Sequence, residues 1–389
     1  MSIYRGKGNA EQYDAFMDFI NYVFGFNGNQ KDFKKLLPKL YRRELQPQMQ
    51  NYIVTEDGNF RAAVGAYDHE IVVCGRRLPC RGIGNVAVHP YHRGQGYMKD
   101  CMNAALADMK RDGIVLSTLG GRRQRYNYFS YDKTGSMYQI HLVDDNMRHS
   151  FGATRTPAFA MREVFAGDVR ALGDIAALLA AQIYVPVRAR EELYPIMTTW
   201  HTRIFAAYSG EHFIGYATCL DTTVREVMTV EDADFLPLIC TLYDYLHAGT
   251  LTVCLPEFRQ TYLRAIYRIG EGVSVTPNMS YTVLNYRAVL DAFFALKATY
   301  TALPDGDLPV LIHGFAGDEQ LLLSVRGGVP CISETRLSPV LELSHPEALQ
   351  LLFGPFCPDR LQLPAFARCW LPLPVWMYHV DEGLRGGLQ

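Results

Sequence analysis

The stretch at residues 83–97 constrains the fold of this chain most, because it passes from an apolar run through a glycine-rich turn into a helical pattern. It reads Ile-Gly-Asn-Val-Ala-Val-His-Pro-Tyr-His-Arg-Gly-Gln-Gly-Tyr, and the proline ends the apolar run. A basic turn just before a helix points successive backbone N–H groups in one direction, and the helix dipole adds positive charge there. Glycine lets such a turn approach a diphosphate closely. The stretch therefore predicts a pyrophosphate cradle whose turn residues are Arg93, Gly94, Gln95 and Gly96.

The residues around the turn narrow this prediction, since two glycines near a proline more often form an ordinary turn. The pattern Val86-Ala87-Val88-x-Pro-x-x-Arg93-Gly94-x-Gly96 resembles the acetyl-coenzyme A (acetyl-CoA) signature of the GCN5-related N-acetyltransferases. In that superfamily the strand pairs with the pantetheine arm and the turn holds the pyrophosphate. Met98 departs from the pattern, because many members carry Gly or Ala there. The resemblance implies acetyl-CoA contacts from Val86, Ala87, Val88, Arg93, Gly94, Gln95, Gly96 and Tyr97.

Length and composition describe a globular protein of two or three domains. The chain has 389 residues, an apolar content of 49% and a formal net charge of −2. A net charge this close to zero gives no sign of the basic surface that binds nucleic acid, so nucleic acid is not an expected partner. No apolar run reaches the roughly 18 to 20 residues of a membrane helix, and the amino terminus lacks the apolar region of a signal peptide. We expect no membrane span.

The nine cysteines are scattered and odd in number. The sequence contains no Cys-x-x-Cys pair and no histidines at metal-ligand spacing, so neither a zinc site nor a disulfide framework is favoured. We therefore expect structural thiols in a reducing cytoplasm and no metal cofactor.

Periodicity in the first part of the chain predicts a mixed α/β sheet. Residues 11–24 carry one apolar stripe of an amphipathic helix, and residues 33–45 form a second helical segment interrupted at Pro38. Asp57-Gly58 and Asp68-His69 have the composition of turns between strands. The expected strands are residues 52–55, 60–67, 70–74 and 114–118, with a helix at 96–111.

The rest of the chain loosely repeats this order and then changes character. Residues 150–165 have the composition of a linker. Beyond them we expect helices at 174–184, 232–245 and 256–268 among strands at 203–207, 212–219, 225–229, 249–254 and 272–275. No Arg-Gly-x-Gly turn recurs there, so a duplicated fold without a cofactor site is expected. Last come strands at 280–286, 309–315, 320–325 and 338–342, helices at 288–298 and 346–353, and an aromatic segment, 370–378, that we expect to be buried.

This order resembles the enhanced-intracellular-survival (Eis) family of acetyltransferases. That family is similar in having two tandem acetyltransferase-like domains and a carboxy-terminal domain like a sterol carrier protein. The resemblance implies a catalytic domain at residues 1–150, a degenerate second copy at 160–283 and a sterol-carrier-like α/β domain at 284–389. It also implies a homo-hexamer and an amine acceptor of the aminoglycoside, polyamine or lysine type.

The resemblance further implies a general acid in the segment Tyr126-x-x-Phe129-x-Tyr131. Tyr131 occupies the position at which acetyltransferases of this fold carry their catalytic tyrosine. A phenol with a pKa of about 10 can protonate a leaving thiolate whose conjugate acid has a pKa of about 8.5. Core packing is an equally good account of Tyr126, Tyr128 and Phe129.

The base of the family is the carboxylate of the chain end, which is Gln389 in this sequence. An α-carboxylate with a pKa of about 3.5 becomes a useful base only when burial or neighbouring carboxylates raise that pKa. Asp381 and Glu382 are candidates for that effect. Family members end soon after the aromatic segment, near the position of Leu384, whereas this chain continues for several residues. A base of another kind, such as water or Glu382, is the alternative.

The sequence thus favours an acetyl-CoA-dependent N-acetyltransferase. Two alternatives stay open, namely a lipid or sterol carrier, from the last domain, and a coenzyme A-binding regulator without turnover. The acceptor is not identified, because the acidic candidates Asp14, Asp18, Asp32, Asp381 and Glu382 cannot be ranked by sequence.

Overall fold

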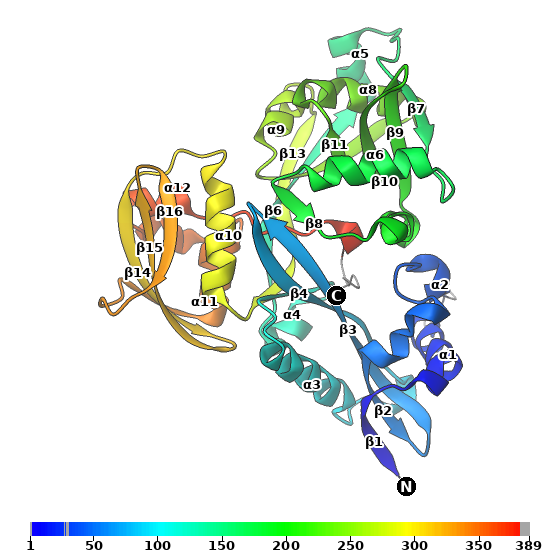
Figure 1. Cartoon of the computed structure of the whole chain (residues 1–389), viewed down its shortest axis with the longest axis vertical. Helices are drawn as coiled ribbons and strands as arrows, with labels where there is room; N and C mark the ends of the chain where they lie inside the picture. The colour runs from blue at the N-terminus through cyan, green and yellow to red at the C-terminus, as the bar shows by residue number, and fades with distance from the viewer. Residues whose placement is uncertain (1, 27, 29–30, 382–389) are drawn as a thin grey trace.

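A mixed sheet of 13 strands runs through two of the three lobes of the molecule (Figure 1). The computed structural model describes residues 2–26, 28 and 31–381. In this part the strand order is β1-β2-β3-β4-β5-β13-β6-β12-β11-β10-β9-β7, and β8 pairs with β3. A separate sheet of four strands, β16-β15-β14-β17, forms the third lobe. The mixed α/β class expected from the sequence is confirmed.

The first lobe has helices on both faces of its sheet. Successive residues on a strand point to opposite faces, so Val54 packs with α3 on one face and Ile53 packs with α1 on the other. The elements of this lobe are β1 (Ile3–Lys7), α1 (Tyr13–Gly25), α2 (Phe33–Leu36), β2 (Asn51–Glu56), β3 (Asn59–Val73), β4 (Arg76–Val88), α3 (Tyr97–Arg111), β5 (Leu116–Leu119), α4 (Arg123–Tyr126), β6 (Asp132–Val143) and α5 (Asp144–Phe151).

The second lobe shares its sheet with the first. Its last strand, β13, lies between β5 and β6 and is antiparallel to both, so a strand from late in the chain completes the first lobe. The elements of the second lobe are β7 (Ala160–Glu163), α6 (Val169–Ala180), β8 (Tyr184–Pro186), α7 (Leu193–Met197), β9 (Arg203–Ser209), β10 (His212–Leu220), β11 (Thr223–Thr229), α8 (Phe235–Tyr245), β12 (Thr250–Pro256), α9 (Gln260–Tyr267) and β13 (Gly272–Val283).

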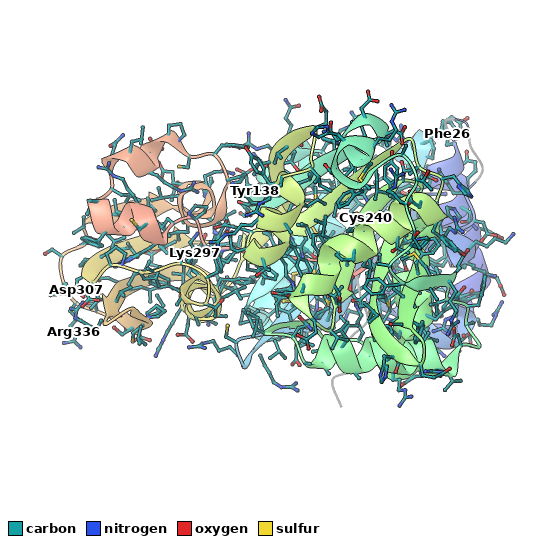
Figure 2. The ribbon with its side chains drawn as sticks, turned by 90° about the horizontal axis from the view of Figure 1, so that it is seen from above. Phe26, Tyr138, Cys240, Lys297, Asp307 and Arg336 are labelled. Atoms are coloured by element: carbon teal, nitrogen blue, oxygen red, sulfur yellow. The ribbon has the colours of Figure 1, made fainter. Side chains whose placement is uncertain are left out.

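The third lobe presents helix α10 to the rest of the molecule (Figure 1). Lys297 of this helix forms an ion pair of 2.5 Å with Glu257, which follows β12, and Figure 2 shows Lys297 on the side of the lobe that faces the other two. The elements are α10 (Tyr286–Ala298), β14 (Gly306–Gly314), β15 (Gly317–Arg326), β16 (Val329–Glu334), β17 (Leu341–Ser344), α11 (His345–Phe353) and α12 (Ala365–Trp370).

The aromatic segment after α12 is buried, as expected. Trp370, Trp376 and Tyr378 are each at most 3% exposed. The segment runs back from the third lobe to the second, where the Tyr184 hydroxyl donates to the carbonyl of Trp376 at 2.7 Å. A short 3-10 turn, η10 (His379–Asp381), follows it.

Several local predictions were wrong, and each failure has a physical cause. Asp68-His69 is not a turn, because β3 continues through it and His69 pairs with Cys80 of β4. The helical segment expected at 33–45 does break before Pro38, because proline disfavours the helical conformation of the residue before it, but beyond Pro38 the expected range contains only the 3-10 turn η2 (Arg43–Leu45). Strand β7 lies in the expected linker. Among the described residues, no helix combines the length and the apolar character needed to cross a membrane.

Candidate active site

Strands β4 and β5 separate at the centre of the first lobe. They pair in parallel from Cys80 and Leu116 to Ile83 and Leu119, where β5 ends. Strand β4 continues to Val88, so in the part of the chain that the structure describes its backbone has no strand partner on this side after Ile83. Unpaired N–H and C=O groups of this kind can pair with an extended ligand. This edge contains Val86, Ala87 and Val88.

A β-bulge marks the point where the two strands separate. The register of β3 with β4 shifts between Ala63 and Gly65, and Asn85 adopts a positive φ of 53°. The Asn85 amide donates to the side chain of Asn51 at 3.0 Å, and Asn51 donates to the Tyr67 hydroxyl at 3.0 Å. This buried polar chain holds the bulge on the face of the sheet that α1 covers.

The turn after β4 leaves the start of α3 open. Gly94 and Gly96 have φ values of 82° and 81°, and a Cβ atom at either position would meet no atom within 4 Å. Gly96 is the N-cap of α3, and no side chain among the described residues caps the helix. The first N–H groups of a 15-residue helix are therefore available to an anion. Arg93 and Gln95 are exposed beside them, so the residues present fit a pyrophosphate.

Tyr97 points inward from this turn. Its side chain is 5% exposed, and its hydroxyl donates to the buried carboxylate of Glu56. This hydrogen bond and a bond of 2.9 Å from Arg61 keep the pKa of Glu56 below its usual range. The side chains of Tyr97 and Ala87 are both buried. Only the backbone of these two residues is therefore available to a cofactor.

Tyr131 lies on the same side of the sheet as α3 and Ile83. It is 1% exposed, and its hydroxyl lies 2.6 Å from the Ser117 hydroxyl. Because Ser117 donates to the carbonyl of Arg81 at 2.5 Å, Tyr131 is the donor in the first contact. Burial raises the pKa of Tyr131, so the phenol keeps its proton at neutral pH. Tyr128, by contrast, is 65% exposed.

The third lobe holds the turn that carries Tyr131 in place. The sequence gave no indication of this contact. His345 Nδ1 accepts from the N–H of Phe315 at 3.2 Å, so its Nε2 donates to the carbonyl of Ser130 at 3.0 Å. Burial lowers the pKa of His345 to about 4, and the ring is neutral at physiological pH. Gln350 donates to Asp132 at 2.8 Å. Residues on both sides of Tyr131 are thus held by α11.

A basic group next to the cradle was also missed. Lys99 in the first turn of α3 places its ammonium 5.2 Å from the centre of the Tyr128 ring. This contact joins the start of α3 to the turn that follows α4 across the separation of β4 and β5. Arg122 and Arg125 are exposed on the α4 side. The helical position of Lys99 in the first turn after the glycines was the signal that could have identified it.

Most of the acidic candidates have structural roles. Asp14 pairs with Arg43, Asp32 caps α2, and Asp381 pairs with Arg188 in the protein interior. Asp18 is exposed. Glu382 and Gln389 lie outside the described residues.

With this geometry in view, comparisons with known proteins identify the first lobe. Residues 6–135 match the family model of the acetyltransferase (GNAT) domain. The first lobe is a GNAT acetyltransferase domain. By enzyme class the protein is therefore an N-acetyltransferase. No curated protein has a significant sequence match to the chain.

Solved structures with low sequence identity share the fold over nearly the whole chain. A probable N-acyltransferase from Enterococcus faecalis has a TM-score of 0.67 at 16% identity and covers 97% of this chain and 98% of its own. A GCN5-related N-acetyltransferase from Anabaena variabilis has a TM-score of 0.64 at 14% identity, covering 99% and 98%. Eis1 from Mycobacterium abscessus has a TM-score of 0.60 at 14% identity, covering 99% and 100%.

Proposed function

We propose that the protein transfers the acetyl group of acetyl-CoA to a primary amine by direct attack, as an Eis-like enzyme. The observation that carries this proposal is the separation of β4 and β5 beside the uncapped start of α3. The fold shared with Eis1 supports it. Release of free thiol from acetyl-CoA, measured with a panel of aminoglycosides, polyamines and lysine-containing peptides, tests it.

In this proposal the backbone of residues 86–88 pairs with the pantetheine arm. Arg93, the two glycines and Gln95 hold the pyrophosphate, and Lys99 adds a further positive charge. The amine attacks the thioester carbonyl, the carbon–sulfur bond breaks, and the leaving thiolate takes a proton from Tyr131. An attacking amine needs a base for its own proton, which is the role proposed for the carboxylate of Gln389.

Replacement of Tyr131 by phenylalanine should lower kcat about a hundredfold and change KM little, because the lost hydroxyl acts in the transition state. Initial rates at saturating acetyl-CoA measure this effect. Tyr128→Phe is the matched control, since Tyr128 lies in the same segment but is exposed. Near-full activity of Tyr131→Phe would assign Tyr131 to the core alone.

Removal of residues 385–389 should abolish turnover and leave acetyl-CoA binding intact. Asp381 is fixed by Arg188, so the eight residues from 382 to 389 can span at most about 26 Å in extended form. Steady-state rates and calorimetric titration with acetyl-CoA measure the two properties separately. Wild-type turnover in the truncated protein would exclude Gln389 as the base and favour water or Glu382.

A hexamer and a role of the third lobe in lipid binding stay predictions. The large hollow of this lobe, about 690 Å³, is lined by charged and polar side chains such as Arg287, Asp318, Glu334 and Arg336. Apolar ligands prefer sites lined by hydrophobic side chains. The hollow therefore does not favour the carrier alternative over the acetyltransferase.

A further inference from the structure

The first residue of helix α11, His345, reaches from the third lobe into the first. Its side chain is 6% exposed. The helix begins directly after β17, so no loop separates His345 from the sheet of its own lobe. The N–H of Ser344 donates to the carboxylate of Glu347 at 2.8 Å, which fixes the residue before His345. The imidazole therefore extends from a junction that is held within the third lobe.

The surroundings of the ring give each of its nitrogens one role. The backbone N–H of Phe315 can only donate, so Nδ1, which lies 3.2 Å from it, is an acceptor. The Tyr286 hydroxyl lies 3.0 Å from the same nitrogen. The single proton of the neutral ring is therefore on Nε2, which lies 3.0 Å from both the carbonyl of Ser130 and the hydroxyl of Thr282. The third lobe thus fixes His345 as a donor toward the first lobe.

The carbonyl that His345 contacts belongs to the peptide unit that leads into Tyr131. The other end of this unit, the N–H of Tyr131, donates to the carbonyl of Tyr126 at 3.2 Å. The first lobe therefore holds one end of the peptide unit and the third lobe holds the other. Because a peptide unit is planar, these two bonds together set the orientation of the backbone at Tyr131.

The turn before Tyr131 has a strained backbone, so such a restraint has a physical purpose. Ser130 has φ and ψ values of 65° and 18°, in the left-handed region. This region is unfavourable for residues other than glycine. Strained residues of this kind persist where the surrounding structure holds them, and they are frequent at active sites. The bond from His345 is one of the contacts that hold Ser130 in this conformation.

The hydroxyl of Tyr131 depends on the geometry of this turn. It donates to Ser117 at 2.6 Å, and Ser117 pairs with Arg81 two residues before β4 and β5 separate. Because the hydroxyl is at the far end of the side chain, a small rotation of the backbone moves it further than it moves the Cα atom. A displacement of about 1 Å at a reacting group can lower a rate about a hundredfold.

We propose that His345 is a positioning residue for acetyl transfer, through which the third lobe completes the active site of the first lobe. This inference rests on the proposed role of Tyr131 as the acid, and it gives the third lobe a part in turnover. The residues proposed to bind acetyl-CoA, 86–97, all belong to the first lobe, so loss of the His345 bond should act on kcat and not on cofactor affinity. The Lys297–Glu257 ion pair joins the third lobe to the second independently of His345.

Two substitutions of His345 separate the roles of its nitrogens. In His345→Gln the side-chain amide can take the place of Nε2, so a donor to the carbonyl of Ser130 is kept. In His345→Asn the shorter side chain can replace only Nδ1, so the acceptor for Phe315 is kept and the donor to Ser130 is lost. Both variants are made in the wild-type chain and in Tyr131→Phe.

Trp370→Phe is the control for lost stability. The indole N–H of Trp370 donates to the carbonyl of Pro304 at 3.0 Å, so this variant also removes a 3.0 Å bond from a buried ring, but within the third lobe. Thiol release gives kcat and the KM for acetyl-CoA, with whichever aminoglycoside, polyamine or lysine-containing peptide wild type acetylates fastest. Hydrogen exchange of residues 123–131 measures local opening of the turn without turnover.

His345→Asn should lower kcat about tenfold or more and leave the KM for acetyl-CoA unchanged, because the cradle is intact. His345→Gln should recover most of this loss, and Trp370→Phe should keep the wild-type kcat. In the Tyr131→Phe chain, His345→Asn should change kcat less than twofold, since the group that it positions is already absent. Exchange in the turn should be faster in His345→Asn than in His345→Gln.

Equal losses from His345→Asn with and without the Tyr131 hydroxyl, equal losses for Asn and Gln, or wild-type kcat in His345→Asn would each overturn the inference. If His345→Asn does not fold, the same comparison is made in Ser130→Gly, because glycine adopts the left-handed conformation without strain. Absence of acetyl transfer by wild type, or full activity of Tyr131→Phe, would instead contradict the proposed function. Hydrogen exchange would then still decide whether His345 holds the turn.

Discussion

Replacement of Gly96 by glutamate is expected to abolish acetyl-CoA binding. The turn lets the first N–H groups of α3 face an open space, and Gly96 itself caps the helix. A glutamate there would put a carboxylate where the pyrophosphate binds. Two like charges 4 Å apart near a protein surface repel by about 4 kcal/mol, which corresponds to about a thousandfold in Kd. Titration calorimetry with acetyl-CoA measures the loss.

The control for this variant is Gly58→Glu. Gly58 has a φ of 82°, against 81° for Gly96, and a Cβ atom there would also meet no atom within 4 Å. Both variants therefore carry the same left-handed backbone strain, about 1–2 kcal/mol, and differ in their position relative to the cradle. Gly58→Glu should bind acetyl-CoA as wild type does. Equal acetyl-CoA affinities of the two variants would show that the turn at residues 93–96 is not part of the cofactor site.

The strand, the glycine turn and the helix at residues 83–111 could be predicted because the information for them is local. Strand, proline, glycines and helix follow one another within residues 83–97, and the helix expected at 96–111 is α3 (Tyr97–Arg111). The expected burial of segment 370–378 was confirmed for a similar reason, since an aromatic run of this density requires a core.

Contacts between distant segments could not be predicted in this way. Strand β13 enters the sheet between β5 and β6, although more than a hundred residues separate it from β6 in the chain. His345 reaches the turn before Tyr131 from α11, and no periodicity indicates such a partner. His69 shows the reverse error, because a polar pair that resembles a turn is held in a strand by pairing with β4.

The carboxy-terminal segment depends on one further contact of this kind, the buried network around Arg188. Its guanidinium bonds Glu226 of β11 at 2.8 and 2.9 Å and Asp381 of η10 at 2.7 Å, in each case with two nitrogens. The three side chains are each about 1% exposed. Paired bonds of this geometry are the strong form of a salt bridge, and neither carboxylate can be rehydrated in place.

Replacement of Arg188 by methionine is therefore expected to destabilise the protein by about 3–5 kcal/mol, since it leaves two buried carboxylates without their cation. The melting temperature should fall by several degrees in calorimetry. Arg203→Met is the matched control, because Arg203 also bonds a carboxylate, Glu163, with two nitrogens but is half exposed. Its loss should stay below about 1 kcal/mol.

A triple variant separates charge from packing at this site. Arg188→Met combined with Glu226→Gln and Asp381→Asn removes all three charges and should recover part of the stability that the single change loses. Equal melting temperatures for Arg188→Met and Arg203→Met would contradict a structural role of the network. Because the proposed base, the carboxylate of Gln389, follows Asp381 by only eight residues, Arg188→Met should also lower acetyl transfer without changing the affinity for acetyl-CoA. That combination would place the function of the network in positioning the chain end.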